Sequence, residues 1–274
     1  MNECIINNKY KILDKIGNGQ FGNVYRAVHK KTNVQVAIKF ENLEGGTKLL
    51  QHETTILNYL RGEGAKQIPT VLWYGLYGEN LCLVMTLFEC SLLQYIESRT
   101  LTAEKKYNII RVSLSIVESI HQKGVIHRDI KPENIMLKDG NLYLIDFGFS
   151  TFFINEKREH IRDERLRAEI TGTPKWCSFY IEGGVTPARR DDVISLSYIL
   201  LFMIYGTLPW SSIDSVSASE KRDARRELKF VQNILSLVDD IALYGFIKSC
   251  YELAFEEEPD YGALNDILKN NIKK

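Results

Sequence analysis

The sequence predicts an α+β protein with two lobes, a small one built mainly of strands and a larger one built mainly of helices. Up to about residue 87, apolar and polar residues alternate over short segments that turn residues separate, which is typical of β-hairpins. Beyond Leu87 the apolar residues recur three or four positions apart, which is typical of helices. We place the lobes at residues 1–87 and 88–274. A hinge near residues 86–90 is expected to border a ligand cleft.

Length and composition are those of an ordinary globular protein. The 274 residues are 45% apolar and carry a formal net charge of zero, so charge gives no general reason to expect nucleic acid or membrane partners. The five cysteines are scattered and form no C-x-x-C pair, which favours a reducing compartment over disulfides or a zinc site. The longest apolar run, residues 196–205, is too short to span a membrane and predicts a buried helix. We expect a cytoplasmic monomer, and the basic run KRDARR at 221–226 leaves the nucleus open.

The expected elements follow from these patterns. In the first lobe, VYRAVHKKTNVQVAIKF predicts a hairpin over residues 24–40 with HKKTN as its turn. Residues 47–60 predict a helix, and residues 72–87 predict two more strands around Gly-Glu-Asn. The second lobe is expected to contain short strands within 133–148 and helices over 91–98, 102–123, 191–205, 228–238 and 240–254.

The glycine-rich segment GNGQFGNV, residues 17–24, has two interpretations. In a dinucleotide-binding fold such glycines open a helix. Here they lead into the alternating segment VYRAV, so a flap between two strands is favoured. Because Gly17, Gly19 and Gly22 carry no side chains, backbone N–H groups of such a flap can approach phosphates.

Lys39 ends the segment VAIK and has a candidate partner. A lysine is usually solvated, but Glu53 shares a helical face with Leu49, Ile56 and Leu60 and should therefore point inward. A buried carboxylate needs a partner. A pair between Lys39 and Glu53 would orient the lysine toward nucleotide phosphates.

The strongest chemical signal is IHRDIKPENI, residues 126–135, followed by LIDFG at 144–148. Asp129 is a candidate to accept or orient a hydroxyl proton, and Lys131 a candidate to neutralise a transferring phosphoryl group. Asn134 and Asp146 offer hard oxygen ligands for magnesium. The alternative, a polar loop of structural importance only, does not account for these residue types in this order and spacing.

These motifs resemble protein kinases from Tyr10 to about Ile267. Within them the chain is similar to the casein kinase 1 family, as a divergent member. The activation segment lacks Ala-Pro-Glu and instead has TGTPKWCSFYIE, RRDDVISL and GTLPW, with further matches in IPTVLWYG and EPDYGAL. The resemblance implies a bilobal kinase fold with the ATP cleft between the lobes.

The same resemblance implies the roles of single residues. Asp129 would orient the hydroxyl, Lys131 would offset charge on the γ-phosphate, and Lys39, held by Glu53, would contact the α and β phosphates. Magnesium would be held by Asn134 and Asp146. The ATP-binding residues would be Ile16, Gly17, Gly19, Gly22, Val24, Ala37, Lys39, Met85, Thr86, Leu87, Phe88 and Met136.

Further roles concern substrate and support. In this family, cations near the activation segment hold an acidic or phosphorylated residue of the substrate, and Lys175, Lys221 and Arg167 are the candidates here. The alternative is that Lys175 only solvates its segment. Asp192 would brace the HRD loop. Arg128 and Thr173 would also support the site, Thr173 by hydrogen bonds near Asp129 and Lys131.

The expected function is transfer of the ATP γ-phosphate to Ser or Thr of acidic or primed protein substrates, with ATP and magnesium as cofactors. Three alternatives stay open. A pseudokinase scaffold is one, although none of Lys39, Asp129 and Asp146 is lost. A small-molecule kinase with the same fold is another. A tau-tubulin or vaccinia-related relative of casein kinase 1 is the third.

Overall fold

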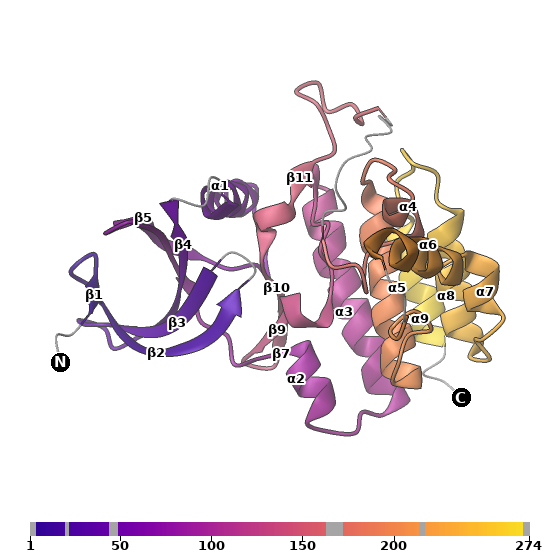
Figure 1. The fold of residues 1–274 in the computed structure, drawn as a ribbon, viewed down its shortest axis with the longest axis horizontal. Coiled ribbons are helices and arrows are strands. Elements are labelled where there is room, and N and C mark those ends of the chain that lie inside the picture. Colours follow the sequence, from indigo (N-terminus) through magenta and orange to yellow (C-terminus); the bar gives the residue numbers. More distant parts are fainter. Residues whose placement is uncertain (1–3, 20–21, 44–48, 163–171, 214–216, 271–274) are drawn as a thin grey trace.

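The computed structural model describes residues 4–19, 22–43, 49–162, 172–213 and 217–270 (Figure 1). A strand-rich lobe and a helical lobe lie side by side, with the β9–β10 hairpin and helix α2 close to the junction (Figure 1). This is the mixed α+β, two-lobed arrangement that the sequence predicts.

The smaller lobe is a six-stranded antiparallel sheet with the order β1-β2-β3-β4-β6-β5. The predicted hairpin is confirmed by the pairing of β3 with β4, and the two predicted strands around Gly-Glu-Asn by the pairing of β5 with β6. The strands are β1 (Ile5–Ile6), β2 (Tyr10–Gly19), β3 (Gly22–His29), β4 (Gln35–Asn42), β5 (Val71–Tyr77) and β6 (Asn80–Thr86).

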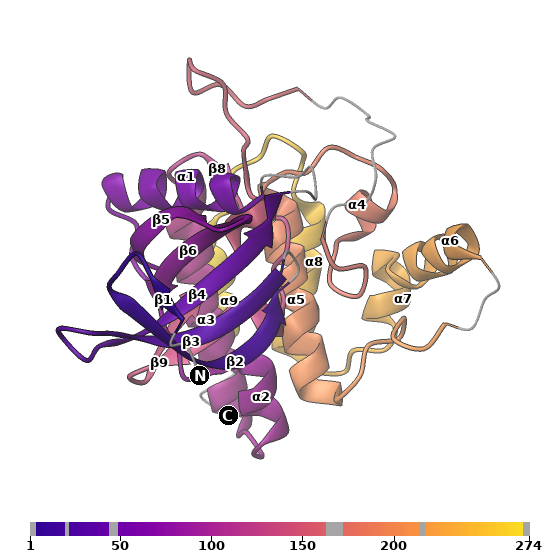
Figure 2. The same ribbon diagram turned by 60° about the vertical axis from the view of Figure 1, so that its left-hand side comes forward.

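Helix α1 (Leu49–Gly62) packs against β4, β5 and β6 (Figures 1 and 2). Side chains alternate between the two faces of a strand. Val36 and Ile38 of β4 therefore join an apolar cluster on one face, whereas Ala37 joins Leu50 of α1 on the other. Lys39 continues the Ala37 side, which directs it toward α1.

The larger lobe is built around the apolar helix α5, whose side chains are buried almost throughout. The predicted buried helix at 196–205 is thus confirmed, and among the described residues no helix is long and apolar enough to cross a membrane. The helices of this lobe are α2 (Leu92–Glu97), α3 (Ala103–His121), α4 (Phe179–Glu182), α5 (Arg189–Tyr205), α6 (Ala218–Leu228), α7 (Val231–Leu235), α8 (Ile241–Glu252) and α9 (Tyr261–Asn270).

The larger lobe also contains short paired strands. Strands β9 (Ile135–Lys138) and β10 (Asn141–Leu144) form the predicted hairpin, and β7 (Cys90–Ser91) pairs with β9. Strand β8 (Val125–Ile126) pairs with β11 (Thr151–Phe152). The loop that carries Asp129 runs from β8 to β9, and the segment that carries Asp146 runs from β10 to β11. Each is therefore held at both ends by a paired strand.

The predicted helix over 228–238 is wrong in its extent. Helix α6 ends at Leu228, Phe230 is extended, and only Val231–Leu235 is helical. The break coincides with Lys229, whose side chain turns inward and is completely buried. Helix α6 itself was not predicted, because it buries no residue and so lacks an apolar period, although its Ser217–Glu220 capping box is visible in the sequence.

Candidate active site

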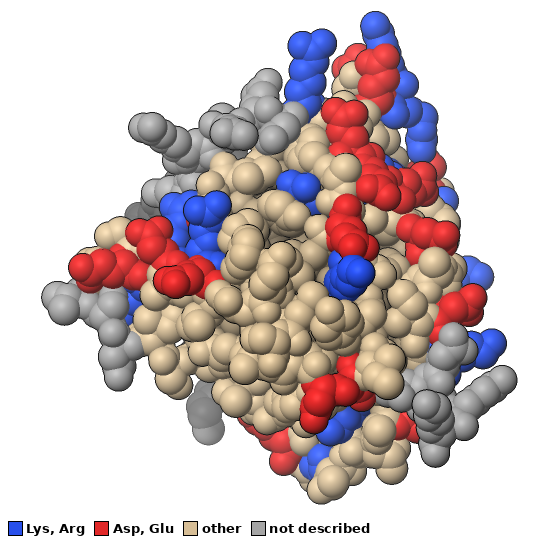
Figure 3. Space-filling model, turned by 90° about the vertical axis from the view of Figure 1, so that its right-hand side faces the viewer, with Lys and Arg blue, Asp and Glu red and all other residues tan. Residues whose placement is uncertain are grey.

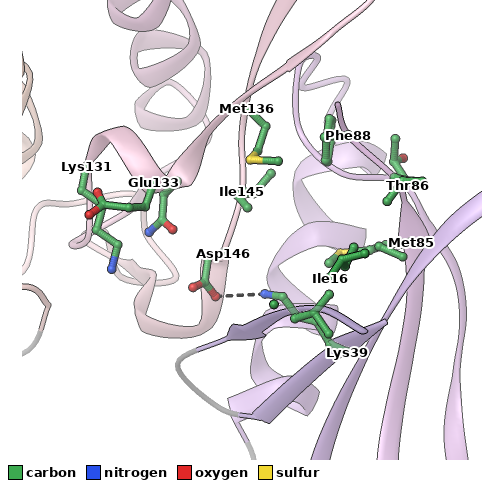
Figure 4. Close-up of a pocket in the computed structure, with 15 residues that line it drawn as sticks. Ile16, Lys39, Met85, Thr86, Phe88, Lys131, Glu133, Met136, Ile145 and Asp146 are labelled. Carbon is green, nitrogen blue, oxygen red and sulfur yellow. Dashed lines mark hydrogen bonds and ion pairs between the residues drawn. The ribbon is translucent and has the colours of Figure 1, made fainter. Parts of the chain in front are cut away.

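A cleft of about 490 Å³ lies between the lobes (Figure 4). Its apolar lining comes from the sheet on one side and from β9 on the other. Two lining residues, Glu133 and Ile145, were not singled out from the sequence. The expected residues found in the lining are Ile16, Gly17, Val24, Ala37, Lys39, Met85, Thr86, Leu87, Phe88, Lys131, Asn134, Met136 and Asp146.

The glycine-rich segment joins two strands, β2 and β3, as the flap interpretation predicts. Gly19 pairs with Gly22 as the last pair before the connection, and Gly22 is not among the residues that line the cleft. A Cβ at Gly22 would lie 1.9 Å from the carbonyl oxygen of Phe40. Glycine is therefore required here by the close approach of the neighbouring strand.

Lys39 is held between two carboxylates at the edge of the cleft. Its Nζ lies 2.9 Å from each carboxylate oxygen of Glu53. It also lies 3.0 Å from Oδ1 of Asp146, the contact that is dashed in Figure 4. Glu53 is completely buried and Lys39 is 7% exposed. The expected pair thus exists and ties helix α1 to β4, and Asp146 joins the same cluster from the segment after β10.

Electrostatics keep Lys39 and Asp146 charged, whereas burial raises the pKa of Glu53 against the effect of Lys39. Burial disfavours the Lys39 ammonium, but Glu53 and Asp146 outweigh it and raise the lysine pKa. Burial also disfavours the Asp146 carboxylate, but Lys39 outweighs it and lowers the pKa of Asp146. With two carboxylates facing one ammonium, the cluster favours a further cation in the cleft.

Glu41 is a residue that the sequence analysis missed. Its carboxylate accepts hydrogen bonds from the backbone N–H groups of Leu49 (3.0 Å) and Leu50 (3.1 Å), at the start of helix α1. Glu41 lies two residues after Lys39 on β4, so it points to the same face. It joins β4 to the helix that carries Glu53, and a carboxylate at a helix N-terminus is favourable.

Asp129 is engaged on both carboxylate oxygens. Oδ1 accepts hydrogen bonds from the backbone N–H of Thr173 (2.9 Å) and from its hydroxyl (2.8 Å). Oδ2 lies 2.7 Å from Nζ of Lys131 and 3.1 Å from Nδ2 of Asn134. Lys131 also donates to the hydroxyl of Thr173 (2.8 Å), so the hydrogen bonds expected of Thr173 are present.

Asn134 and Asp146 present free oxygens that fit a magnesium ion. Nδ2 of Asn134 donates to the backbone oxygen of Asp129 (2.9 Å), which leaves the amide oxygen without a hydrogen bond among the described residues. Oδ1 of Asp146 faces Lys39, and Oδ2 is likewise not engaged within the described segments. Two hard oxygen donors beside a phosphate site suit magnesium, which is usually bound through few protein ligands.

Asp192 of α5 supports the loop of residues 127–134, which carries Asp129. Its carboxylate accepts hydrogen bonds from the backbone N–H groups of His127 (2.7 Å) and Arg128 (2.9 Å) and from Nε2 of His121 (2.9 Å). These bonds lower the pKa of Asp192 against the effect of burial. They hold Arg128 in a left-handed conformation (φ 72°), and its guanidinium donates to the carbonyl of Phe149 (3.2 Å).

The expected anion-binding residues are not joined to one another. Nζ of Lys175 lies 4.6 Å from the ring centre of Phe202 and 5.0 Å from that of Trp176. Lys221 is exposed on α6, and no ion pair engages either lysine within the described part of the chain. Arg167 lies outside the described residues.

Residues 172–182, which we call the lip, rest on a buried lysine that the sequence analysis did not single out. Nζ of Lys229 donates to the carbonyls of Pro174 and Cys177, each at 2.7 Å, and lies 3.2 Å from Oε1 of Glu182. Arg225 reaches the same carboxylate at 2.8 Å. The backbone of the lip is thereby fixed to helix α6.

Comparison with protein families agrees with this geometry. The family model described as protein kinase domain matches residues 10–260. The match includes the glycine-rich turn, Lys39, Glu53, the loop of Asp129 and the lip. It covers well over half of the chain.

Proposed function

The chain belongs to the protein kinase family, and we propose that it is a serine/threonine protein kinase that transfers the γ-phosphate of ATP to protein substrates. One observation carries the proposal: Lys39, Lys131, Asn134 and Asp146 line one cleft, and Asp129 lies directly behind it in contact with Lys131 and Asn134. The cleft volume of about 490 Å³ is within the usual range for a nucleotide-sized ligand.

In this mechanism the chain mainly positions and neutralises charge. Ile16, Val24, Ala37 and Met136 line the cleft where they would enclose the adenine ring, and Lys39, fixed by Glu53, would contact the α and β phosphates. Asn134 and Asp146 would hold magnesium, which when bound would neutralise phosphate charge. Because the phosphoryl-transfer transition state is largely dissociative, correct placement contributes most of the rate.

Asp129 orients the attacking hydroxyl, and its surroundings support an aliphatic alcohol. Lys131 and Thr173 both lie within hydrogen-bond distance of its carboxylate, and Thr173 belongs to the lip. A short Ser or Thr side chain brings its backbone close to the lip, whereas a tyrosine would hold its backbone several ångströms farther away. Lys131 is also placed to offset charge on the transferring group.

Preference for acidic or primed substrates, and membership of the casein kinase 1 family, are part of the proposal. Support comes from the motifs TGTPKW, RRDD and GTLPW and from the accessible cations Lys175 and Lys221 near the lip. A phosphate held by lysines gains charge-assisted hydrogen bonds, although without the bidentate geometry of arginine. The substrate would have to bring the two lysines to one anion, since they do not touch in the free protein.

We further propose a cytoplasmic monomer, possible also in the nucleus, that acts on proteins and not on nucleic acid or membranes. On the face of the larger lobe in Figure 3, Lys and Arg are scattered among Asp and Glu around a broad uncharged area. That view shows no continuous basic patch among the described residues, and such a patch is what nucleic acid binding would favour.

The test is phosphate transfer to matched peptides. One Ser peptide carries phosphoserine three residues before the target, a second carries alanine there, and a third replaces the target with tyrosine. We expect transfer to both Ser peptides, a preference for the primed one that Lys175→Ala removes, and no transfer to tyrosine. Transfer to tyrosine at a similar rate would contradict the serine/threonine assignment. Equal transfer to both Ser peptides would contradict the primed preference.

A further inference from the structure

A second hollow, distinct from the nucleotide cleft, lies on the larger lobe where α2, α3 and the β9–β10 hairpin meet (Figure 1). It has a volume of about 370 Å³, which is within the usual range of ligand-binding pockets. We call it the α2–α3 groove. Its walls are the apolar side chains of Leu92, Ile109, Val112, Leu137 and Leu142.

Two cations gather at one end of this groove without acidic partners. Nζ of Lys105 lies 5.3 Å from the ring centre of Tyr95, and the guanidinium of Arg99 lies 4.0 Å from it. Tyr95 and Lys105 both line the groove. Within the described residues, no carboxylate forms an ion pair with Lys105 or Arg99.

Lys105 and Arg99 bring two positive charges to the Tyr95 end of the groove. Lys105 and Arg99 lower the pKa of the Tyr95 hydroxyl by hydrogen bonding to it. Lys105 stands in the first turn of α3, which begins after the N-cap Thr102, and a helix N-terminus adds to the positive potential. By contrast Glu89, the acidic residue of the lining, is engaged by the backbone N–H of Asp139 (2.8 Å).

We propose that the α2–α3 groove docks an extended peptide segment of a protein partner, in which an acidic residue is followed by apolar ones. The apolar walls take the apolar side chains, and Lys105, Arg99 and Tyr95 take the carboxylate. An apolar anchor in a pocket with charge complementarity at its rim is how such surfaces gain affinity and select partners. The groove does not depend on whether the cleft is catalytic.

The groove borders the hinge and the floor of the nucleotide cleft. Side chains of β9 alternate, so Met136 lines the cleft while the next residue, Leu137, lines the groove. In the hinge, Phe88 likewise lines the cleft and the next residue, Glu89, lines the groove. A docked peptide would therefore contact the main chain that forms the adenine pocket without competing with the nucleotide.

The experiment selects random displayed dodecapeptides on the full chain and then measures the affinities of the enriched peptides by fluorescence anisotropy. We expect acidic-then-apolar peptides whose binding weakens about tenfold or more in Lys105→Glu and in Arg99→Glu. Lys30→Glu, an exposed charge reversal in the β3–β4 turn, is the matched control and should change nothing. Saturating ADP should leave the affinity unchanged.

Several results would overturn the proposal. Enriched peptides without this pattern, or peptides that bind Lys105→Glu as tightly as the wild type, would place the contact elsewhere. Displacement by ADP would assign the peptides to the nucleotide cleft. Binding of decanoate but of no peptide would make the groove a site for amphiphilic carboxylates instead.

Discussion

Lys39 and Lys229 are both buried lysines that face a buried glutamate, yet their surroundings differ. Lys39 touches two carboxylates and lines an open cleft of about 490 Å³. Lys229 is fully enclosed, and it shares the single carboxylate of Glu182 with Arg225. The pKa of Lys39 is raised by its carboxylates, whereas burial lowers that of Lys229. The comparison predicts that Lys39, with two carboxylates beside an open cleft, is the functional lysine and that Lys229 is a structural one.

The difference between the two lysines is tested most directly by removing the ammonium of Lys39 from the cleft. Lys39→Met should lower the rate of phosphate transfer by about 10²–10³-fold, because the charged contact that places the α and β phosphates is lost. The measurement is single-turnover transfer from radiolabelled ATP at saturating magnesium. A Lys39→Met enzyme within a factor of three of the wild type would show that the open cluster is not the catalytic one.

The enclosed lysine should instead control stability. Lys229→Met leaves Glu182 and two carbonyls of the lip without their buried donor, and the free energy of unfolding should fall by about 3–5 kcal/mol. Urea denaturation measures it. Lys221→Met, an exposed position on helix α6, is the control and should stay within about 0.5 kcal/mol. If the two variants are equally stable, the structural role assigned to Lys229 is wrong.

A smaller effect is expected where Glu41 anchors α1. Glu41→Ala removes the acceptor of two N–H groups, and capping contacts of this kind contribute about 1 kcal/mol to stability. If that free energy is expressed in the placement of Glu53 and Lys39 at the transition state, kcat should fall roughly fivefold. Glu41→Gln, which keeps one acceptor oxygen, should recover part of the loss. Asp14→Ala, in an exposed pair with Arg26, is the control. A change in stability with kcat untouched would make Glu41 merely structural.

The smallest expected effect is a pH dependence at Asp191. Burial raises the pKa of this carboxyl to about 6, although the hydroxyl of Ser178 and the backbone N–H of Ala188 donate to it. Because the pKa is higher in the folded than in the unfolded state, ionisation costs folding free energy as pH rises from about 4 to about 6. Between pH 5 and pH 7 the wild type should lose about 1 kcal/mol relative to Asp191→Asn in urea denaturation. Parallel stability curves for the two proteins would contradict this.

The residues of the open cluster could be predicted from the sequence because their motifs are short and ordered. VAIK, HRDIKPEN and DFG each hold their functional groups within a few residues, and an inward-facing Glu53 on an apolar stripe implied a partner such as Lys39. The enclosed cluster could not be predicted in this way. Lys229, Glu182 and Arg225 are joined only by tertiary packing, and the helix that brings two of them together has no apolar period.

The role of Glu41 could not be predicted from the sequence either, although its partners Leu49 and Leu50 are only 8 and 9 residues away. A glutamate on an alternating strand suggests a solvent-facing residue, and nothing in the local pattern shows that the start of helix α1 folds back over it. The extent of the helix predicted at 228–238 failed for a related reason, since the inward turn of Lys229 interrupts a segment whose local pattern favours continuation. Contacts between distant segments decided both cases.

The most direct test of the central claim is transfer of radiolabelled γ-phosphate from ATP to casein by the wild type and by Asp129→Asn, with and without magnesium. We predict transfer that requires magnesium and falls by at least about 10²-fold in Asp129→Asn, while both proteins bind ATP. If the wild type binds ATP but transfers no more phosphate than Asp129→Asn, the cleft is a nucleotide-binding scaffold and the catalytic role proposed for it is wrong.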